Sequence, residues 1–431
     1  MAEYRKRVAD GILMEKLEAT GAVIVEGPKW CGKTTTAERV AKSVIYMAEP
    51  KKRERNLLYA RLEPEKILDG ECPRLVDEWQ IAPILWDAIR RDAIRHRVDH
   101  DDSCGRFILT GSAVPAKRDD MKHTGTGRFS WLKMRPMSLW ESGDSLGSVS
   151  LEGLFDGDAL RIADAADHRL EDIAFLVCRG GWPKAVQFSK RRPALEQAFN
   201  YVDAVAESDI SRVDDVSRDP DRARRIMKSY ARLQGSQATA AVIKADMSAN
   251  EDSSFTDVTL HSYLNALRKI FVVEDMPAWN PNLRSKVAIR TSDTRYFVDP
   301  SIATAVMGLG PSALMDELPT FGLLFETLVM RDLRVYAAVP HGEVRHYRDK
   351  NGLECDAVIH LRDGRYGLVE VKMGGEALVE EGAKVLNELA ALIDTKRMKK
   401  PSFKMVVTAV GDCAYAREDG VLVCPIGSLK P

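Results

Sequence analysis

The sequence predicts an α/β protein with a parallel sheet near the N-terminus, a helical middle and a second α/β domain at the C-terminus. Three observations carry this prediction. A glycine-rich motif stands between a predicted buried strand and a predicted helix, apolar residues recur at helical spacing in the middle, and strand patterns alternate with helix patterns after residue 320. The chain has 431 residues. At about 150 residues per domain, roughly three domains are expected.

The composition is that of an ordinary globular protein, with 45% hydrophobic residues and a formal net charge of −1. A net charge this close to zero does not attract the whole protein to nucleic acid, so any such binding must come from local basic clusters such as "RARR" and "KRMKK". No apolar run approaches the roughly 20 residues that span a bilayer, and the charged N-terminus is not a signal peptide. The 7 cysteines are scattered without a C-x-x-C pair, which predicts reduced thiols. We therefore expect a cytoplasmic protein with no membrane partner.

The glycine-rich motif G-x-x-x-x-G-K-T runs from Gly27 to Thr34. "GAVIVEG" has the pattern of a buried parallel strand and "KTTTAERV" that of a helix, which is the setting of a phosphate loop. Backbone N–H groups of such a loop face a phosphate, Lys33 reaches the β- and γ-phosphates, and the Thr34 hydroxyl binds Mg²⁺. ATP and Mg²⁺ are the predicted cofactors. The predicted nucleotide-binding residues are Gly27, Pro28, Lys29, Trp30, Cys31, Gly32, Lys33, Thr34, Thr35 and Thr110.

Two carboxylates follow the next predicted strand, in "PRLVDEWQ". Ligands of open α/β sheets bind at the carboxyl ends of the strands, which favours a functional role over that of solvated loop acids. Asp77 fits a Walker B residue that holds Mg²⁺, and Glu78 fits the base that orients the attacking water.

Further polar residues follow the strand in "GRFILTGSAVP" and the loop in "GTGRFSWLKMRP". Thr110 or Ser112 could contact the γ-phosphate or the water, and capping of a turn is the alternative. Arg128 or Arg135 could stabilise the developing phosphoryl charge, and surface ion pairs are the alternative. Arg128 is favoured because glycines flank its loop.

Seven stretches resemble, in order, the bacterial and archaeal AAA-type ATP-binding proteins of the AAA+ superfamily that carry a C-terminal domain of unknown function. They are "GAVIVEGPKWCGKTTTA", "LVDEWQ", "FILTGSA", "GRFSWLKMRPMSLWES", "RGGWPKAV", "LFETLVMRDL" and "LECDAVIHL…GLVEVK". The resemblance spans nearly the whole chain. It implies an AAA-type P-loop ATPase domain, a helical region and a C-terminal fold like that of PD-(D/E)XK nucleases. The expected bounds are 1–150 for the ATPase domain, 151–220 for a helical lid, 221–300 for a winged helix and 301–431 for the nuclease-like domain.

The winged-helix prediction rests on three helical patterns followed by "FVVEDMPAW". In the third, Leu260, Leu264, Leu267 and Phe271 form one apolar stripe. The opposite face of this helix carries polar and basic side chains, and it is the face with which the recognition helix of a winged-helix protein contacts DNA. DNA is therefore a possible partner. Packing of the winged helix on protein is the alternative. The residues of the opposite face are His261, Asn265 and Arg268.

The C-terminal patterns run in the order αβββαβ of a restriction-endonuclease-like core. In "YGLVEVK", Glu370 and Lys372 lie two residues apart and share one face of a strand. Asp356 in the neighbouring strand can meet Glu370, and Glu326 in the preceding helix could complete a Mg²⁺ site. Lys372 can stabilise charge at a phosphodiester. Asp356, Glu370 and Lys372 are thus predicted as catalytic, and Glu326, Asp356 and Glu370 as metal ligands.

The function predicted from the sequence is an ATP-binding and ATP-hydrolysing P-loop protein that acts on or with nucleic acid and carries a Mg²⁺-dependent nuclease-like domain. The alternative is a nucleotide-switched regulatory or binding protein whose nuclease-like domain binds a partner without cleavage. A homo-oligomer is compatible with both.

Overall fold

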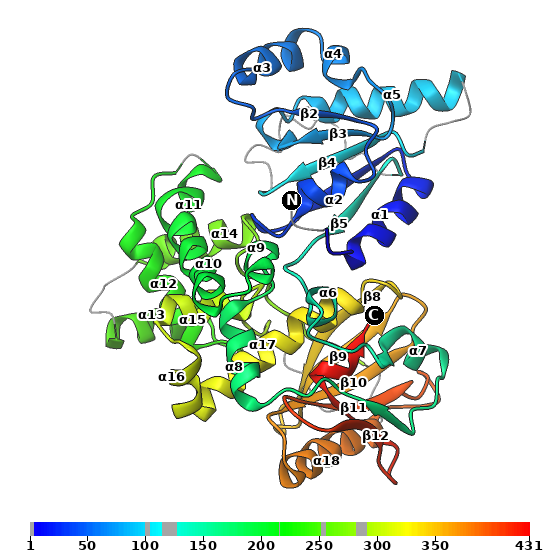
Figure 1. The fold of residues 1–431 in the computed structure, drawn as a ribbon, viewed down its shortest axis with the longest axis vertical. Coiled ribbons are helices and arrows are strands. Elements are labelled where there is room, and N and C mark those ends of the chain that lie inside the picture. The colour runs from blue at the N-terminus through cyan, green and yellow to red at the C-terminus, as the bar shows by residue number, and fades with distance from the viewer. Residues whose placement is uncertain (1–3, 100–103, 114–126, 215, 251–255, 282–290) are drawn as a thin grey trace.

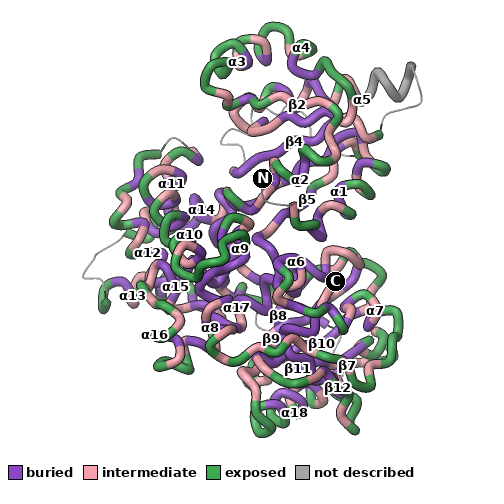
Figure 2. The backbone as a smooth tube through the Cα atoms, viewed as in Figure 1, coloured by how far each residue is buried: buried purple, intermediate pink, exposed green. Residues whose placement is uncertain are grey.

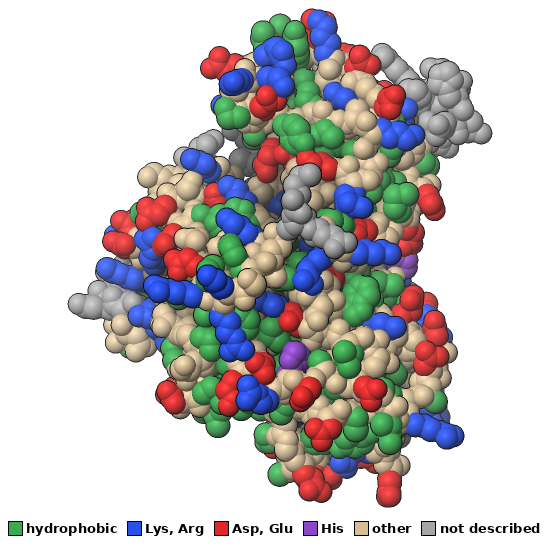
Figure 3. Space-filling model, viewed as in Figure 1, with side chains coloured by type: hydrophobic (Ala, Val, Ile, Leu, Met, Phe, Trp, Pro, Cys, Tyr) green, Lys and Arg blue, Asp and Glu red, His purple; other side chains and the backbone are tan. Residues whose placement is uncertain are grey.

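The computed structural model describes residues 4–99, 104–113, 127–214, 216–250, 256–281 and 291–431. In Figure 1 the N-terminal sheet lies at the top, the helices of the middle region lie at the left, and the C-terminal sheet lies at the bottom. Within the described residues, no helix is both long and apolar enough to cross a membrane. Figure 3 shows acidic and basic side chains interspersed over the visible face, as the near-zero net charge leads one to expect.

The N-terminal sheet is parallel throughout, with strand order β2-β3-β4-β1-β5. Its central strands are buried on both faces, shown in purple in Figure 2. Alternate residues of β1 point into separate cores, Val23 and Val25 into one and Ala22 and Ile24 into the other. The strands are β1 (Ala22–Glu26), β2 (Ser43–Tyr46), β3 (Arg74–Asp77), β4 (Phe107–Gly111) and β5 (Phe129–Lys133).

Helices pack on both faces of this sheet. α1 precedes β1 and α2 follows the phosphate loop, while α3, α4 and α5 lie beside β2 and β3 at the top of Figure 1. The strand β5 and the helix α1 were not predicted from the sequence. These helices are α1 (Val8–Ala19), α2 (Lys33–Glu38), α3 (Arg53–Leu62), α4 (Glu65–Leu68) and α5 (Leu85–Asp99). The short helix α6 (Leu139–Ser142) follows β5 and contacts the C-terminal part of the chain.

The middle region is helical. α12, α13 and α14 pack on one another, and antiparallel bridges at Val273–Phe297 and Met276–Thr294 follow them, in the order of the predicted three helices and wing. The helices are α8 (Leu170–Arg179), α9 (Pro183–Gln187), α10 (Arg191–Ala204), a π-helical turn (Val205–Asp209), α11 (Ile210–Arg212), α12 (Pro220–Arg232), α13 (Ala240–Asn250), α14 (Asp257–Lys269), α15 (Pro300–Met307) and α16 (Pro311–Asp316).

Two predicted boundaries require correction. α15 and α16 pack against α8, α10 and α12, so residues 300–316 belong with the middle helices and not with the C-terminal domain. The segment after residue 148 forms β6 (Val149–Ser150), α7 (Leu151–Asp156) and β7 (Ile162–Asp164). β7 pairs with β12 of the C-terminal sheet, so residues 149–164 are part of that domain and not of a lid.

The C-terminal domain has the predicted element order α-β-β-β-α-β, from α17 to β11, and adds strands beyond it. Its sheet order is β7-β12-β13-β11-β10-β9-β8, antiparallel among β8, β9 and β10 and parallel between β10 and β11. The elements are α17 (Leu318–Tyr336), β8 (Gly342–Arg348), β9 (Glu354–Leu361), β10 (Tyr366–Lys372), α18 (Glu376–Leu392), β11 (Phe403–Thr408), β12 (Cys413–Ala416), β13 (Val421–Pro425) and β14 (Leu429–Lys430).

Candidate functional site

The phosphate loop curls tightly between β1 and α2. Gly27 and Gly32 have φ values of 151° and 100°, and a Cβ on Gly27 would collide with the carbonyl oxygen of Met134. Glycine is therefore required at both positions, as the motif predicted. The loop begins where β1 ends, at the carboxyl edge of the parallel sheet.

Hydroxyl and carboxylate oxygens converge next to this loop. The Thr34 hydroxyl donates to Asp77 Oδ1 at 2.7 Å, and the Thr110 hydroxyl donates to the same oxygen at 2.6 Å. The Lys33 ammonium donates to the carbonyl oxygens of Gly27 (2.9 Å) and Pro28 (2.7 Å). Thr34 and Asp77 thus offer adjacent hard oxygen ligands, the type that Mg²⁺ prefers.

Glu78 lies one residue beyond β3 in a left-handed conformation, with φ of 56°. Its carboxylate accepts from the Gln80 side chain, and the Ser112 hydroxyl lies 3.4 Å from both of its oxygens. A positive φ angle costs free energy in a residue that has a Cβ, and such strained residues are often found at functional sites, where the backbone fixes the direction of a side chain. Here it turns Glu78 toward the loop after β4.

A cavity of about 890 Å³ separates the phosphate loop from α9 and α10. Of the predicted nucleotide-binding residues, Gly27, Pro28, Cys31 and Thr110 do not line this cavity, and Thr110 instead lies buried behind Asp77. Its lining residues are Lys29, Trp30, Gly32, Lys33, Thr34, Thr35, Glu78 and Ser112 from the N-terminal domain and Trp182, Pro183, Lys184, Gln187, Gln197 and Asn200 from the middle helices.

An ion pair joins the phosphate loop to the middle helices. The Lys29 ammonium lies 2.5 Å from Asp209 Oδ1, and the Asp209 side chain is only 9% exposed. Asp209 ends the π-helical turn after α10, a local distortion often found at functional sites. No local sequence pattern points to Asp209, because its partner lies 180 residues away in the chain.

Neither candidate arginine lines the cavity. Arg128 precedes β5, and its carbonyl oxygen accepts from the N–H of Ala22 at the start of β1. It therefore lies at the amino edge of the sheet, opposite the phosphate loop, and the prediction that it contacts a nucleotide is wrong within one chain. Arg135 follows β5 and makes a paired contact with Glu274, at 2.9 and 2.7 Å. For Arg135, the alternative of an ion pair therefore describes the structure better than a contact with a phosphoryl group.

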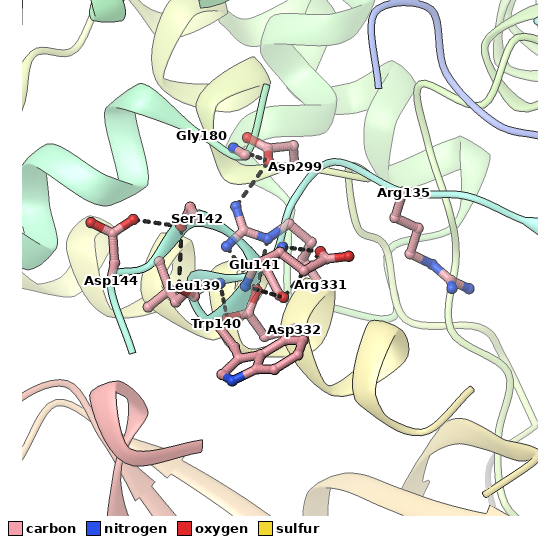
Figure 4. Close-up of polar contacts among 12 residues, drawn as sticks. Arg135, Leu139, Trp140, Glu141, Ser142, Asp144, Gly180, Asp299, Arg331 and Asp332 are labelled. Atoms are coloured by element: carbon pink, nitrogen blue, oxygen red, sulfur yellow. Dashed lines mark hydrogen bonds and ion pairs between the residues drawn. The ribbon is translucent and has the colours of Figure 1, made fainter. Parts of the chain in front are cut away.

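A buried polar cluster behind the phosphate loop was missed entirely. Arg7 donates to the carbonyl oxygen of Cys31 at 2.7 Å and to Glu141 at 2.9 Å. Figure 4 shows how the segment at Glu141 meets α17, where Asp332 accepts from the N–H of Leu139 at 2.9 Å. Three stretches that carry the family resemblance therefore meet at one place, which no local sequence pattern could reveal.

Arg331 completes this cluster. It lies between Asp332, at 2.8 Å, and Asp299, at 3.0 Å, and all three side chains are at most 1% exposed (Figure 4). Asp299 also accepts from the N–H of Gly181 at 2.9 Å, next to Trp182 in the cavity wall. The cluster thus joins α17 to both walls of the cavity.

The predicted DNA-facing side of α14 divides into two parts. His261 and Asn265 are exposed, as predicted. Arg268 instead donates to Asp275 Oδ2 at 2.8 Å and lines a cavity of about 260 Å³ together with Pro28 and Lys133. This end of α14 faces the N-terminal domain, which agrees with the alternative of packing on protein.

The C-terminal side chains gather as the strand spacing predicted. The Asp356 N–H donates to Glu370 at 3.2 Å, and the Val371 N–H donates to Asp356 at 2.8 Å. Lys372 lies 3.4 Å from Glu370 and 3.1 Å from Glu381. Glu326 on α17 accepts from the buried Tyr296 hydroxyl. Asp356, Glu370 and Lys372 therefore lie together where β9 begins and β10 ends.

Crowded negative charge marks this cluster. Burial and the Asp356 carboxylate raise the pKa of Glu326 to about 8. Burial raises the pKa of Asp356 to about 6, and burial together with Asp356 raises the pKa of Glu370 well above its usual value. Across the described residues, however, no three His, Cys, Asp or Glu side chains are arranged to hold a metal ion. The prediction that Glu326, Asp356 and Glu370 form a ready metal site is therefore wrong for this conformation, because Glu326 is turned to Tyr296.

Comparison with known proteins agrees with this layout. A model of the AAA domain family matches residues 19–142. Models of two domains of unknown function, DUF8612 and DUF4143, match residues 170–313 and 321–429, respectively. Residues 19–142 are an AAA-type P-loop domain. The matched ranges also place residues 300–313 with the middle helices, as the packing does.

Similar whole chains add little about function. The uncharacterized protein Rv2008c of Mycobacterium tuberculosis and the uncharacterized protein Mb2031c of Mycobacterium bovis are each 21% identical over 97% of this chain and 83% of their own length.

Among solved structures, the Walker-type ATPase PABY2304 of Pyrococcus abyssi is 14% identical, covers 69% of this chain and 94% of its own, and has a TM-score of 0.42. Cdc6p of Pyrobaculum aerophilum is 13% identical, covers 74% and 93%, and has a TM-score of 0.23. These likenesses are too partial to bear on function.

Proposed function

We propose that this protein binds ATP with Mg²⁺ and hydrolyses it in the cavity between the phosphate loop and the helices α9 and α10, and that it acts with nucleic acid. One observation carries the proposal: the Thr34 and Thr110 hydroxyls converge on Asp77, beside Lys33 and Glu78. This is the set of groups that phosphoryl transfer to water requires at the carboxyl edge of a P-loop sheet.

Each side chain has a role that follows from its position. Thr34 and Asp77 would hold Mg²⁺, which would neutralise charge on the phosphates when bound. Lys33 exchanges its bonds to Gly27 and Pro28 for the phosphate oxygens. Glu78, aimed by its left-handed backbone, orients and deprotonates the attacking water, with Ser112 beside it.

The helices across the cavity act as the lid in this proposal. α9 and α10 contribute Trp182, Lys184 and Gln197 to the wall that faces the loop, and the Lys29–Asp209 ion pair joins the two walls. Arg128 lies at the far edge of its own sheet, so it can serve a nucleotide only in a neighbouring copy of the chain. A homo-oligomer, which is part of this proposal, would supply that copy.

The C-terminal domain is proposed to be a nuclease-like module. The αβββαβ order supports this, and so do Asp356, Glu370 and Lys372, gathered at the ends of β9 and β10. In the nuclease interpretation, Asp356 and Glu370 would hold Mg²⁺, and Lys372 would stabilise charge on the phosphate.

The alternative function, a switched binding protein that does not cleave, is favoured by a specific contact. Tyr296 from the middle region holds the Glu326 carboxylate, and a Cβ on Gly235 of the same region would lie 3.4 Å from both Glu326 oxygens. The middle region therefore covers this side of the cluster.

ATP binding is tested with Lys33→Ala, measured by calorimetric titration with ATP and Mg²⁺. Binding should be lost in this variant, whereas Lys42→Ala, an exposed lysine shortly after α2, should bind as the wild type does. A wild-type protein that binds no ATP would overturn the proposal.

Cleavage is tested by nicking of plasmid DNA with Mg²⁺ or Mn²⁺, with and without ATP. Asp356→Asn should abolish nicking, and Asp363→Asn, an exposed aspartate in the turn between β9 and β10, should not. If the wild type nicks under none of these conditions, the non-cleaving alternative is the correct one.

A further inference from the structure

A polar groove of about 470 Å³ lies between the N-terminal and C-terminal domains, away from the nucleotide cavity. One wall is built by α1 and β5, and the other by the end of α17, the start of β8 and the turn between β9 and β10. β5 and β8 are edge strands of their respective sheets. The groove therefore runs along two sheet edges, where backbone groups are not all used in pairing.

The charge of the groove is positive. Five cationic side chains line it against three carboxylates: Lys16, Lys133, Arg135, Arg334 and Arg362 against Glu274, Asp275 and Glu343. Each of these carboxylates already has an ion-pair partner. Lys133 and Arg135 both contact Glu274, Arg268 and Arg295 both contact Asp275, and Arg345 contacts Glu343 at 2.7 Å.

Two of the cations are left over. No ion pair joins Lys16 or Arg362 to a carboxylate within the described part of the chain. Burial and the neighbouring Arg362 charge lower the pKa of Lys16, and the nearby Glu15 carboxylate offsets this only in part. Two neighbouring cations that form no ion pair with a carboxylate repel each other, and a bound anion relieves this repulsion. Phosphates of a polyanion fit this requirement.

An aromatic face accompanies these cations. Trp131 of β5 lines the groove and is 47% exposed, which is unusual for a tryptophan on a strand. Proteins that bind single-stranded nucleic acid combine a basic groove along the backbone with aromatic rings that stack on bases. A duplex keeps its base faces inside the stack, so it could not use Trp131 in this way.

The groove also leads toward the C-terminal carboxylates. The Arg334 guanidinium lies 5.5 Å from the centre of the Tyr296 ring, and the Tyr296 hydroxyl bonds Glu326. One tyrosine side chain thus separates the groove wall from the Glu326 carboxylate. A smaller cavity that shares Lys133 and Arg135 continues the groove past α14, where Arg268 and Asp293 add opposite charges.

We propose that this groove binds single-stranded nucleic acid, with Lys16 and Arg362 contacting phosphates and Trp131 stacking on a base. This proposal rests on the proposed function, which already includes nucleic acid as a partner. It assigns the contact surface to the groove and not to the outer face of α14, which the sequence had suggested.

The test is equilibrium binding of a fluorescent oligothymidylate of about 16 nucleotides, compared with a duplex of equal length. The wild type should bind the single strand more tightly. Lys16→Glu and Arg362→Glu should each weaken binding about tenfold and flatten its salt dependence, by about 0.7 in log–log slope for each phosphate that the variant no longer neutralises. Trp131→Ala should weaken binding about fivefold or more, and Trp131→Phe should restore most of it. Lys51→Glu, an exposed site on the N-terminal domain, is the charge-matched control and should bind as the wild type does.

The outcomes separate the two proposals. If the groove variants bind the oligonucleotide as tightly as the wild type, the groove is wrong and nucleic acid contacts another surface. If the wild type binds ATP but neither the single strand nor the duplex, the groove proposal and the nucleic-acid partner fail together while the ATP site stands. Tighter binding to the duplex, or complete competition by polyglutamate of equal charge, would also overturn it. ATP binding by every variant shows that the chain is folded.

Discussion

The Lys29 ammonium of the phosphate loop lies 2.5 Å from the Asp209 carboxylate at the end of the π-helical turn. A phosphate that approaches the loop must compete with this carboxylate for Lys29. We therefore predict that Asp209→Asn binds ATP a fewfold more tightly than the wild type, whereas Lys29→Ala binds it more weakly. Calorimetric titration with ATP measures both, and weaker binding by Asp209→Asn would mean that the pair instead holds the site in its binding form.

The Arg331 cluster should dominate the stability of the contact between domains. Asp332→Ala leaves the Arg331 guanidinium with one carboxylate and the Leu139 N–H with no acceptor, both in a buried place. Breaking a buried ion pair in this way costs about 3–5 kcal/mol. Removal of the exposed Lys52–Glu49 pair by Lys52→Ala should cost at most about 1 kcal/mol. Chemical denaturation gives both values, and equal losses would show that the cluster does not support the interface.

The raised pKa values at the C-terminal cluster predict a pH dependence of stability. In the folded protein, burial and Asp356 raise the pKa of Glu326 from 4.5 to about 8, so the folded state holds more protons than the unfolded state in that window. The free energy of unfolding therefore falls as pH rises from about 4.5 toward about 8.

Glu326→Gln removes the titrating group and keeps a side chain of nearly the same shape. The variant should lose less stability than the wild type between about pH 5 and about pH 8.5, measured by urea unfolding at each pH. An unchanged pH slope would show that Glu326 does not titrate in this window.

Local patterns were enough to predict the nucleotide edge of the N-terminal sheet. Asp77 and Glu78 follow a buried strand directly, and Gly27 to Thr34 lie between a strand and a helix, so neighbours in the sequence are neighbours in the site. The same holds for Glu370 and Lys372, whose face is set by the two-residue period of one strand.

Contacts distant in sequence were not predictable in this way. Arg7 meets Glu141 across 134 residues, and Leu139 meets Asp332 across 193. β7 is three residues long with no buried residue, and only its pairing with β12 makes it a strand. Arg128 was misplaced because no local pattern indicated β5, and the strand direction decides which edge of the sheet the arginine occupies.

The proposed catalytic role of Glu78 is tested most directly by ATP hydrolysis in Glu78→Gln. The variant removes the proton acceptor and keeps the shape of the side chain, the Thr34–Asp77 pair and Lys33. Phosphate release should fall by about 100-fold or more, the range of general-base catalysis, while ATP and Mg²⁺ bind about as tightly as to the wild type. Hydrolysis at equal rates by wild type and Glu78→Gln would contradict the assignment of this site as the one that turns ATP over.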